Sequence, residues 1–285
     1  MKQFSAISQL NASSRTAGDP MVRSISGDCL TDWQAFCRQL AILRSWLAAR
    51  SEPVWLVHTH DTDLFLVAAL ALMQLGRELV VPGSLQPGLV DAVRKDYAAS
   101  GLLSDEDFPG AVDLRCLRQA AAGQAAGVFN AWQAAGGDNP ELDFLPVDPE
   151  RTRMVLYTSG STGQPKAVPK RLEQVEAEVR NLHRQWGASL EGATVWATVS
   201  HQHFYGMLFQ AFLPLCAGAA IGGERISYPE TFAALVEPSV AVVCSPAFYK
   251  RLAETSGIDC RFARPPLLFS SGGVLPPEIA VQVKA

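Results

Sequence analysis

Residues 158–166 are the part of the sequence whose residue types are best suited to chemistry. An apolar run, Met154 to Tyr157, comes directly before them and predicts a buried strand. The loop that follows contains only Thr, Ser and Gly until Gln164, Pro165 and Lys166 close it. Glycines allow backbone N–H groups to approach a ligand, hydroxyls add donors, and the lysine adds a positive charge. This combination predicts binding of a polyanion such as a phosphate chain.

Two better-known glycine-rich motifs do not fit this loop. The Walker P-loop requires Gly-Lys followed directly by Ser or Thr, whereas Lys166 follows Pro165 and precedes Ala167. The nucleophile elbow, Gly-x-Ser-x-Gly, requires glycine at the position of Ser159. A flexible Gly/Ser linker is the structural alternative. The position of the loop between a strong strand and another ordered block argues against a linker.

Two more polar turns follow predicted strands. One has the sequence Ser-His-Gln-His-Phe-Tyr-Gly over residues 200–206, and the other has Ser-Ser-Gly-Gly over residues 270–273. The first is also consistent with an aromatic turn that lines the core. The second, considered alone, is a common Gly-rich turn.

The elements that must position these turns alternate along the chain. Strands are predicted at residues 54–57, 79–81, 112–117, 154–157, 167–168, 194–199, 219–221, 240–244 and 267–270. Helices are predicted at residues 32–47 (with Thr31 as N-cap), 64–75, 88–99, 172–186, 205–216, 229–236 and 246–255, and from residue 276 onward. Alternation with short connections predicts an α/β protein with mainly parallel, doubly wound sheets and flanking helices. Because ligands bind beyond the carboxyl ends of such strands, we expect the three turns to converge on one cleft.

A boundary between two similar subdomains is predicted near residue 149. Residues 120–139 are rich in Ala and Gly, and three prolines lie between residues 140 and 149. We therefore expect residues 1–149 to form an N-terminal α/β subdomain, with an irregular lead-in over residues 1–27. Residues 150–285 would form a second α/β subdomain that carries the phosphate-binding loop.

Composition excludes several classes of protein. Of the 285 residues, 48% are hydrophobic and 18% charged, and the net charge is −4, which gives no reason to expect a nucleic acid or an anionic membrane as partner. The N-terminus lacks a secretory signal, and the apolar run over residues 64–75 is too short to span a bilayer. Six cysteines without a Cys-x-x-Cys pair predict reduced thiols in a cytoplasmic protein.

Two histidines and two aspartates within residues 58–63 raise the question of a metal site. We favour a strand-to-helix loop in which Thr62 or Asp61 caps the next helix. No metal ligands are therefore predicted in the protein.

The segment Tyr157 to Lys166 resembles the signature loop of the adenylate-forming enzymes, the superfamily of acyl- and aryl-CoA synthetases, luciferases and peptide-synthetase adenylation domains. Ala167 departs from the pattern, because the family usually has Gly there. The resemblance implies ATP and Mg²⁺ as cofactors. The residues that it assigns to the phosphates of the nucleotide are Thr158, Ser159, Gly160, Ser161, Thr162, Gly163 and Lys166.

The other two turns resemble later parts of the same family pattern. His203, three residues before Gly206, matches the family's His that borders the reacting carboxylate, and it is the expected catalytic residue; His201 fits less well. Gly272 and Gly273 match the stretch that borders the adenine. The residues that the resemblance assigns to the substrate are His203, Phe204, Tyr205, Gly206, Met207 and Ser271.

The resemblance implies an ATP-dependent carboxylic acid:AMP ligase, which forms an acyl- or aryl-adenylate and passes the acyl group to CoA or to an acyl carrier protein. The turn at residues 202–206 is more similar to bacterial ligases that load aryl or polyunsaturated acyl groups onto carrier proteins. The resemblance covers roughly residues 50–285, and the family's later motifs and small C-terminal lid domain lie outside it. We therefore expect a truncated fold with little or no turnover by itself. A non-catalytic nucleotide- or acyl-binding module and, less well supported, a phosphotransferase remain as alternatives.

Overall fold

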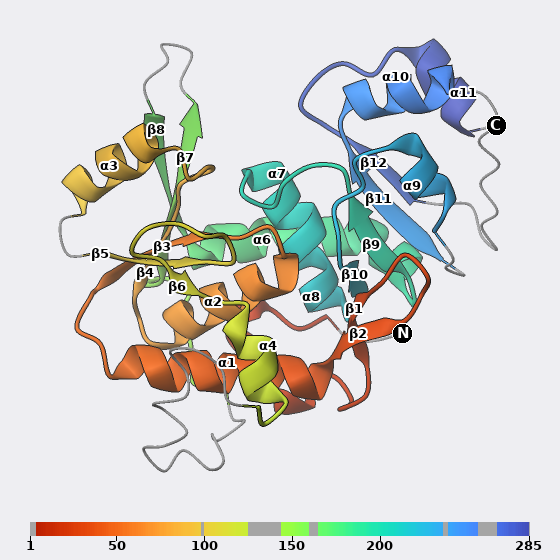
Figure 1. Cartoon of the computed structure of the whole chain (residues 1–285). Coiled ribbons are helices and arrows are strands. Elements are labelled where there is room, and N and C mark those ends of the chain that lie inside the picture. Colours follow the sequence, from red (N-terminus) through yellow and green to blue (C-terminus); the bar gives the residue numbers. More distant parts are fainter. Residues whose placement is uncertain are drawn as a thin grey trace. The chain divides into compact units, whose positions relative to one another are not determined.

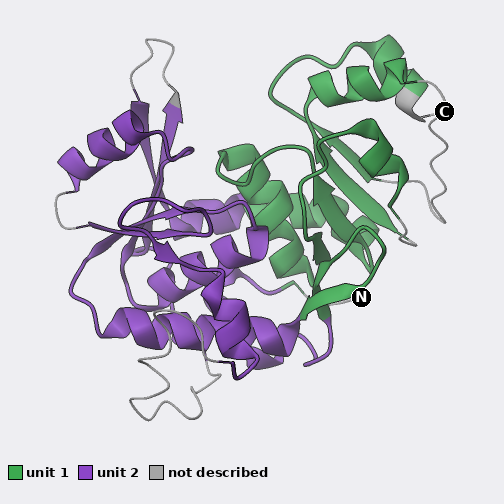
Figure 2. Cartoon of the chain, viewed as in Figure 1, with its two compact units in different colours: residues 1–4, 20–31, 179–285 green, residues 5–19, 32–178 purple. Residues whose placement is uncertain are grey.

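The computed structural model describes residues 4–97, 100–124, 144–159, 165–235, 239–255 and 267–284 (Figure 1). These residues form two compact units, each built on a six-stranded sheet (Figure 2). Unit 1 comprises residues 1–4, 20–31 and 179–285, and unit 2 comprises residues 5–19 and 32–178. The predicted fold class, α/β with mainly parallel sheets and flanking helices, is confirmed.

The sheet of unit 2 has the strand order β6-β5-β3-β4-β7-β8. Its strands are β3 (Val54–His58), β4 (Glu78–Val81), β5 (Ser100–Ser104), β6 (Val112–Asp113), β7 (Arg153–Ser159) and β8 (Pro165–Arg171). Neighbouring strands are parallel from β6 to β7, and β8 is antiparallel to β7. The carboxyl ends of β3, β4, β5 and β7 therefore share one edge of the sheet.

Among the described residues, the elements that accompany this sheet include the helices α1 (Trp33–Ala48), α2 (Thr62–Gln74), α3 (Pro87–Asp96) and α4 (Cys116–Ala121) and the short 3₁₀ turns η1 (Ile7–Gln9) and η2 (Ala12–Ser14). Every residue of α2 is buried, as expected for a helix that is apolar on all sides. The expected N-cap of α1 was Thr31, but the cap is Asp32, whose carboxylate accepts a hydrogen bond from the Ala35 N–H at 2.7 Å.

The sheet of unit 1 has the strand order β12-β11-β9-β10-β1-β2. Its strands are β1 (Pro20–Arg23), β2 (Cys29–Asp32), β9 (Thr194–Ala197), β10 (Ala220–Gly222), β11 (Val240–Cys244) and β12 (Leu267–Ser270). Its helices are α7 (Phe204–Gly206), the π-helical segment η5 (Met207–Phe212), α8 (Leu213–Ala217), α9 (Pro229–Ala233), α10 (Pro246–Glu254) and α11 (Pro277–Lys284). Helix α6 (Leu172–Trp186) begins in unit 2, ends in unit 1 and leads into η4 (Gly187–Leu190).

Each face of this sheet carries its own set of side chains. Trp196 and Val242 pack with Phe248 and Tyr249 of α10 in one buried cluster, against which Leu268 also packs. Phe269, the next residue along β12, contacts aromatic rings from α6 and η5 instead. Because successive strand residues point to opposite faces, the sheet has helices on both sides.

Some elements differ from expectation. The sequence predicts nothing over β1, β2 and β5, and the expected strand at residues 112–117 is only Val112–Asp113, with α4 starting at Cys116. Strand β5 contains no β-branched residue, and its Gly101 lies so close to the indole of Trp55 that a Cβ would overlap the ring. Strand β1 pairs with β10, about 200 residues away, so no local pattern reveals it.

The division into units also differs from the expected boundary at residues 149 and 150. Strand β7 pairs with β4 in the register Leu79↔Met154, so the segment with the phosphate-binding loop extends the first sheet and does not start a second. The units divide between Glu178 and Val179, inside α6. Most of the expected boundary stretch, residues 125–143, lies outside the described residues.

Two expectations from composition can be compared with the structure. Five cysteines fall in the described ranges, and all five are free thiols; Cys260 lies outside those ranges. Within the part of the chain that the structure describes, none of the helices has the length and apolar character needed to cross a membrane.

Candidate functional site

The predicted phosphate-binding loop joins β7 to β8. Thr158 and Lys166 are directly opposite each other in this antiparallel pair, and the Thr158 hydroxyl lies 3.4 Å from the Lys166 carbonyl oxygen. Both residues are exposed, and directly opposed residues point to the same face. Thr158 and Lys166 therefore lie on the same face of the hairpin at the base of the loop. Residues 160–164, which include the predicted Gly160, Ser161, Thr162 and Gly163, lie outside the described residues, as does the Ser159 side chain.

The base of the loop is fixed by contacts with α3. Tyr157, 5% exposed, donates its hydroxyl to Asp96 Oδ2 at 2.8 Å. Burial and the neighbouring Asp96 carboxylate raise the pKa of the Tyr157 hydroxyl, so it stays protonated and donates. The other two predicted turns belong to unit 1. Convergence of all three turns on one cleft therefore stays a prediction.

In unit 1, the turn after β9 and the turn after β12 meet at the carbonyl oxygen of Cys244. This oxygen belongs to the last residue of β11, the strand between β9 and β12. It accepts a hydrogen bond from the Tyr205 hydroxyl at 3.3 Å and another from the Ser271 N–H at 3.4 Å. The carboxyl edge of this sheet therefore brings together two segments that lie more than sixty residues apart in the sequence.

The two histidines of the first turn have different surroundings. His203 is exposed and directly precedes α7, whereas His201 is 2% exposed. The His203 N–H donates to the Ser200 carbonyl, and the His203 carbonyl accepts from the Met207 N–H. These bonds hold the backbone of His203 and leave its imidazole accessible, in keeping with the choice of His203 over His201.

The expected substrate residues next to His203 are not equally accessible. Phe204 and Tyr205 are half-buried, whereas the Met207 side chain is fully buried in the core. Gly206 is buried too, and a Cβ at this position would overlap the carbonyl group of Ser200. Gly206 therefore permits a close backbone contact, while the accessible surface comes from its aromatic neighbours.

The second turn contains a glycine that needs its backbone freedom. Gly272 has φ +86°, in the region that favours glycine, and an added Cβ would meet no atom within 4 Å. At Gly273 the nearest atom to an added Cβ is Pro246 Cγ at 3.7 Å. The turn is exposed and uncrowded, which suits a surface that a flat ring can cover.

Sequence reasoning missed the aromatic residues Trp186, Phe209 and Phe269, whose rings contact one another beside this edge. Tyr205 and Phe209 are four residues apart in a predicted helix, so their i, i+4 spacing was a usable signal. No spacing pattern in the sequence connects Trp186 or Phe269 to Tyr205 and Phe209.

Hydrogen bonds to Asp105 hold the polar loop after β3. Asp105, after β5, accepts backbone N–H bonds from His60 and Asp61, both at 2.9 Å. Helix α2 begins at Thr62 as the loop prediction requires, but Asp61 at the N-cap position makes no side-chain capping bond. Among the described residues, no group of three His, Cys, Asp or Glu side chains could hold a metal ion. The strand-to-helix loop is confirmed, but the expected capping by Thr62 or Asp61 is wrong, because Thr62 is the first helical residue and the Asp61 side chain makes no capping bond.

His58 and His60 in this loop share one carboxylate. His58 Nδ1 lies 2.8 Å and His60 Nε2 lies 3.3 Å from Glu106 Oε1. Burial lowers the pKa of His58, against the opposing effect of Glu106. The neutral form of the His58 imidazole is therefore favoured at neutral pH.

A buried ion pair fixes the start of α2. Asp63 is 2% exposed, and both of its carboxylate oxygens accept from Arg118 of α4, at 2.8 and 3.0 Å. Burial raises the pKa of Asp63, and Arg118 opposes this rise. We expect Arg118→Met to lower the free energy of unfolding by about 2 kcal/mol at neutral pH, because the buried carboxylate loses its partner. Urea unfolding followed by circular dichroism measures the loss.

The loss of stability in the Arg118→Met variant should be larger at neutral pH than in acid. Without Arg118 the folded-state pKa of Asp63 rises further above its ordinary 3.8, so the folded state binds a proton that the unfolded state has released. Stability of the variant should therefore fall as pH rises above that value, and the deficit should shrink in acid. Arg115→Met, which removes only exposed ion pairs to Asp107 and Asp113, is the matched control and should change little. An equal deficit at all pH values would contradict the assignment to Asp63.

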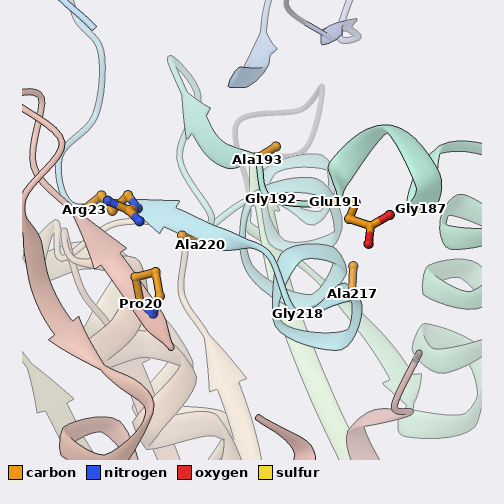
Figure 3. A pocket seen from close by; sticks show the side chains of 9 residues that line it. All are labelled: Pro20, Arg23, Gly187, Glu191, Gly192, Ala193, Ala217, Gly218 and Ala220. Atoms are coloured by element: carbon orange, nitrogen blue, oxygen red, sulfur yellow. The ribbon is translucent and has the colours of Figure 1, made fainter. Parts of the chain in front are cut away.

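A pocket of about 310 Å³ lies elsewhere on unit 1 (Figure 3). Its lining residues are Pro20, Arg23, Gly187, Glu191, Gly192, Ala193, Ala217, Gly218 and Ala220. Pro20, Ala193 and Ala220 begin or precede β1, β9 and β10, so the pocket lies at the amino edge of the sheet, away from His203 and Ser271. It contains none of the predicted site residues.

Comparison with known proteins identifies the family. The model of the AMP-binding enzyme family matches residues 46–285. The chain belongs to the AMP-binding enzyme family. The predicted site residues, from Thr158 to Gly273, all lie within the matched range.

Relatives of this AMP-binding enzyme include the 4-coumarate–CoA ligase of Rhodobacter capsulatus, 31% identical over 112 residues that cover 39% of this chain and 29% of the ligase. The malpinin synthetase of Mortierella alpina is 24% identical over 255 residues, which cover 85% of this chain and 3% of the synthetase. This chain thus spans less than a third of either relative.

Solved structures share the fold. A malonyl-CoA ligase with methylmalonyl-CoA and AMP bound superposes with a TM-score of 0.66 at 20% identity, over 94% of this chain and 55% of the ligase. The N-terminal subdomain of Klebsiella oxytoca NpsA, in complex with 3-hydroxybenzoyl-AMSN, superposes with a TM-score of 0.67 at 17% identity, over 95% of this chain and 67% of that structure. At these identities the likeness establishes the fold of the AMP-binding enzyme and not its substrate.

Proposed function

We propose that this chain belongs to an ATP-dependent ligase that joins AMP to a carboxylic acid and then passes the acyl group to a thiol. The observation that carries the proposal is the β7–β8 hairpin, in which the exposed residues Thr158 and Lys166 pair on one face at the base of a Ser/Thr/Gly loop. The family match over residues 46–285 supports it, as do AMP and a CoA thioester in the malonyl-CoA ligase.

The reaction explains why the hairpin needs a cation. The carboxylate oxygen attacks the α-phosphorus of ATP, the P–O bond to pyrophosphate breaks, and an acyl-adenylate forms. Both reactants are anions, so catalysis depends on holding them together and offsetting their repulsion. In our proposal Lys166 and Thr158, with the predicted Ser159, Gly160, Ser161, Thr162 and Gly163, hold the departing phosphates.

Mg²⁺ fits this scheme as part of the nucleotide. In our proposal the ion would bind together with ATP and would neutralise phosphate charge. The protein's part is to bind the phosphates through Lys166 and the loop donors.

The carboxyl edge of unit 1 supplies the acid and adenine side of the proposal. His203 is exposed beside Tyr205, and Tyr205 and Ser271 are tied to the Cys244 carbonyl. We propose that His203 borders the reacting carboxylate, and that Gly272 and Gly273 lie against the adenine. The thiol that accepts the acyl group, CoA or a carrier protein, would react in the cytoplasm, where ATP and CoA are available.

Acid-dependent exchange of pyrophosphate into ATP tests the proposed function. The assay should be run on residues 1–285 and on the polypeptide that the whole gene encodes. We expect exchange that requires a carboxylic acid in the latter, and weak or no exchange in the 285-residue chain. Absence of exchange by the polypeptide that the whole gene encodes, across a broad panel of acids, would reject the ligase.

The same assay separates the alternatives. A nucleotide- or acyl-binding module would bind MgATP without exchange, and a phosphotransferase would release ADP. The N-terminal subdomain of NpsA was solved in complex with 3-hydroxybenzoyl-AMSN, so ligand binding by a partial chain is a realistic measurement.

A further inference from the structure

Four aromatic rings from three separate segments form a cluster on one face of the sheet of unit 1. Phe209 lies at its centre, with ring centroids 5.0 Å from Tyr205, 4.8 Å from Phe269 and 6.0 Å from Trp186. Trp186 and Phe269 also meet, at 5.2 Å and nearly perpendicular. These are the distances and tilts of favourable aromatic pairs.

The aromatic cluster is partly accessible to ligands, unlike the hydrophobic core. Phe269 is 6% exposed, but Tyr205, Phe209 and Trp186 are all only half-buried. Within η5, Phe209 is the one residue that is not buried. It lies in a π-helical segment, and such segments occur frequently at functional sites because the extra residue per turn redirects a side chain.

The rings form a series of neighbours that starts at the carboxyl edge of the sheet. Tyr205 reaches that edge, because its hydroxyl bonds to the last residue of β11. Phe209 follows four residues later, about 6 Å along the helix. Trp186 comes third in this series, because its ring contacts the rings of Phe209 and Phe269. The series begins two residues after the exposed His203 and ends on a large indole ring.

We infer that the acid handled at this edge is short and planar, a single-ring aryl acid or a short conjugated acid, and that Phe209 and Trp186 set this preference. The inference rests on the proposed function, in which the carboxylate lies beside His203. The acyl group then extends along Tyr205 and lies flat against the accessible face of Phe209, and the Phe209 and Trp186 rings limit its length.

The shape of the acid and its length affect binding beside Phe209 in different ways. A planar acid stacks on the Phe209 ring, whereas a puckered saturated ring of equal size makes fewer contacts and lacks the ring–ring attraction. A long alkyl chain would have to displace Phe209 from its contacts with the other three rings. Phe209 therefore selects for planarity by attraction and against length by occupying space.

The test is a ligand-observed NMR titration of the 285-residue chain with benzoate, cyclohexanecarboxylate and decanoate. We expect benzoate to bind about three- to tenfold more tightly than cyclohexanecarboxylate, and decanoate to bind most weakly. Equal binding of the two ring acids, or no binding of either, would overturn the inference.

Three variants test whether Phe209 determines which acid binds best. Phe209→Leu retains the bulk and should abolish the preference for benzoate over cyclohexanecarboxylate. Phe209→Ala should improve decanoate binding about threefold or more, a gain that loss of folding cannot imitate. Tyr228→Leu, at a 65% exposed aromatic of the same unit outside the cluster, should leave all three affinities unchanged. If both Phe209 variants bind all three acids as the wild type does, the Phe209 ring does not select among the acids and the inference is overturned.

Titration with MgATP separates this inference from the proposed function. Binding of MgATP together with equal binding of the ring acids would reject the planar acid and leave the ligase standing. A benzoate preference that Phe209→Leu abolishes, in a chain that does not bind MgATP, would support the acid site and reject the nucleotide site.

Discussion

Replacing Gly206 with alanine should lower the free energy of unfolding by about 3 kcal/mol, because the new methyl group would overlap the carbonyl of Ser200. This carbonyl is backbone and also accepts the His203 N–H, so it cannot turn aside as a flexible side chain could. Relief of the overlap would displace the turn that presents His203. Chemical denaturation followed by circular dichroism measures the loss, and any exchange activity should fall with it.

Gly88 provides the matched control for this substitution. It lies near the start of α3, is exposed, and an added Cβ would meet no atom within 4 Å. Gly88→Ala should therefore leave stability unchanged or raise it by about 0.5 kcal/mol, since alanine favours a helix. If the Gly206 variant were as stable as the Gly88 variant, the close contact with Ser200 would not be a constraint.

Replacing Lys166 with alanine should weaken MgATP binding by about tenfold to a hundredfold, the loss expected when a charge-assisted contact to phosphate is removed. Lys166 is exposed, so its removal should not affect folding. The measurement is the rise in melting temperature that MgATP causes, or calorimetric titration with MgATP.

Lys250→Ala serves as the control for the lost positive charge. Lys250 is 66% exposed, lies on α10 and contacts only Glu254 among the recorded ion pairs of the described residues. Its removal should leave the MgATP response intact. An unchanged response in the Lys166 variant would count against the assignment of the β7–β8 loop to the phosphates.

Local signals were sufficient for part of the fold. Strands β11 and β12 occupy the predicted residues 240–244 and 267–270, because each is a short apolar run bounded by a polar turn. The strand before the loop was also accessible to sequence reasoning, since residues 154–157 form an apolar run, but the antiparallel pairing of β7 with β8, which places Thr158 and Lys166 in strands, was not predicted. The exposed position of His203 and the buried position of His201 agree with the spacing to Gly206.

The remaining features depend on contacts between distant segments. The carbonyl of Cys244 joins Tyr205 to Ser271, and a backbone oxygen leaves no trace in the sequence. Trp186 and Phe269 become neighbours only when α6 and β12 pack on the same face of the sheet. The expected boundary near residue 149 failed to anticipate that β7 pairs with β4, because proline content marks a turn and not the sheet that the next strand joins.

The exchange of strands between the two parts of the chain has a consequence for folding during synthesis. All six strands of the unit 2 sheet are complete once the ribosome has made residue 171, so that sheet can form early. Strands β1 and β2 are made first and are neighbours in the sheet, yet the other neighbour of β1 is β10, so this edge of β1 stays unpaired until Ile221 is made and can pair with Val22. Such distant pairing is slow, and an unpaired edge strand invites association with other chains. A nascent chain stalled before residue 220 should therefore expose the edge of β1 that pairs with β10. Chaperones that shield strand edges should act before residue 220 is made.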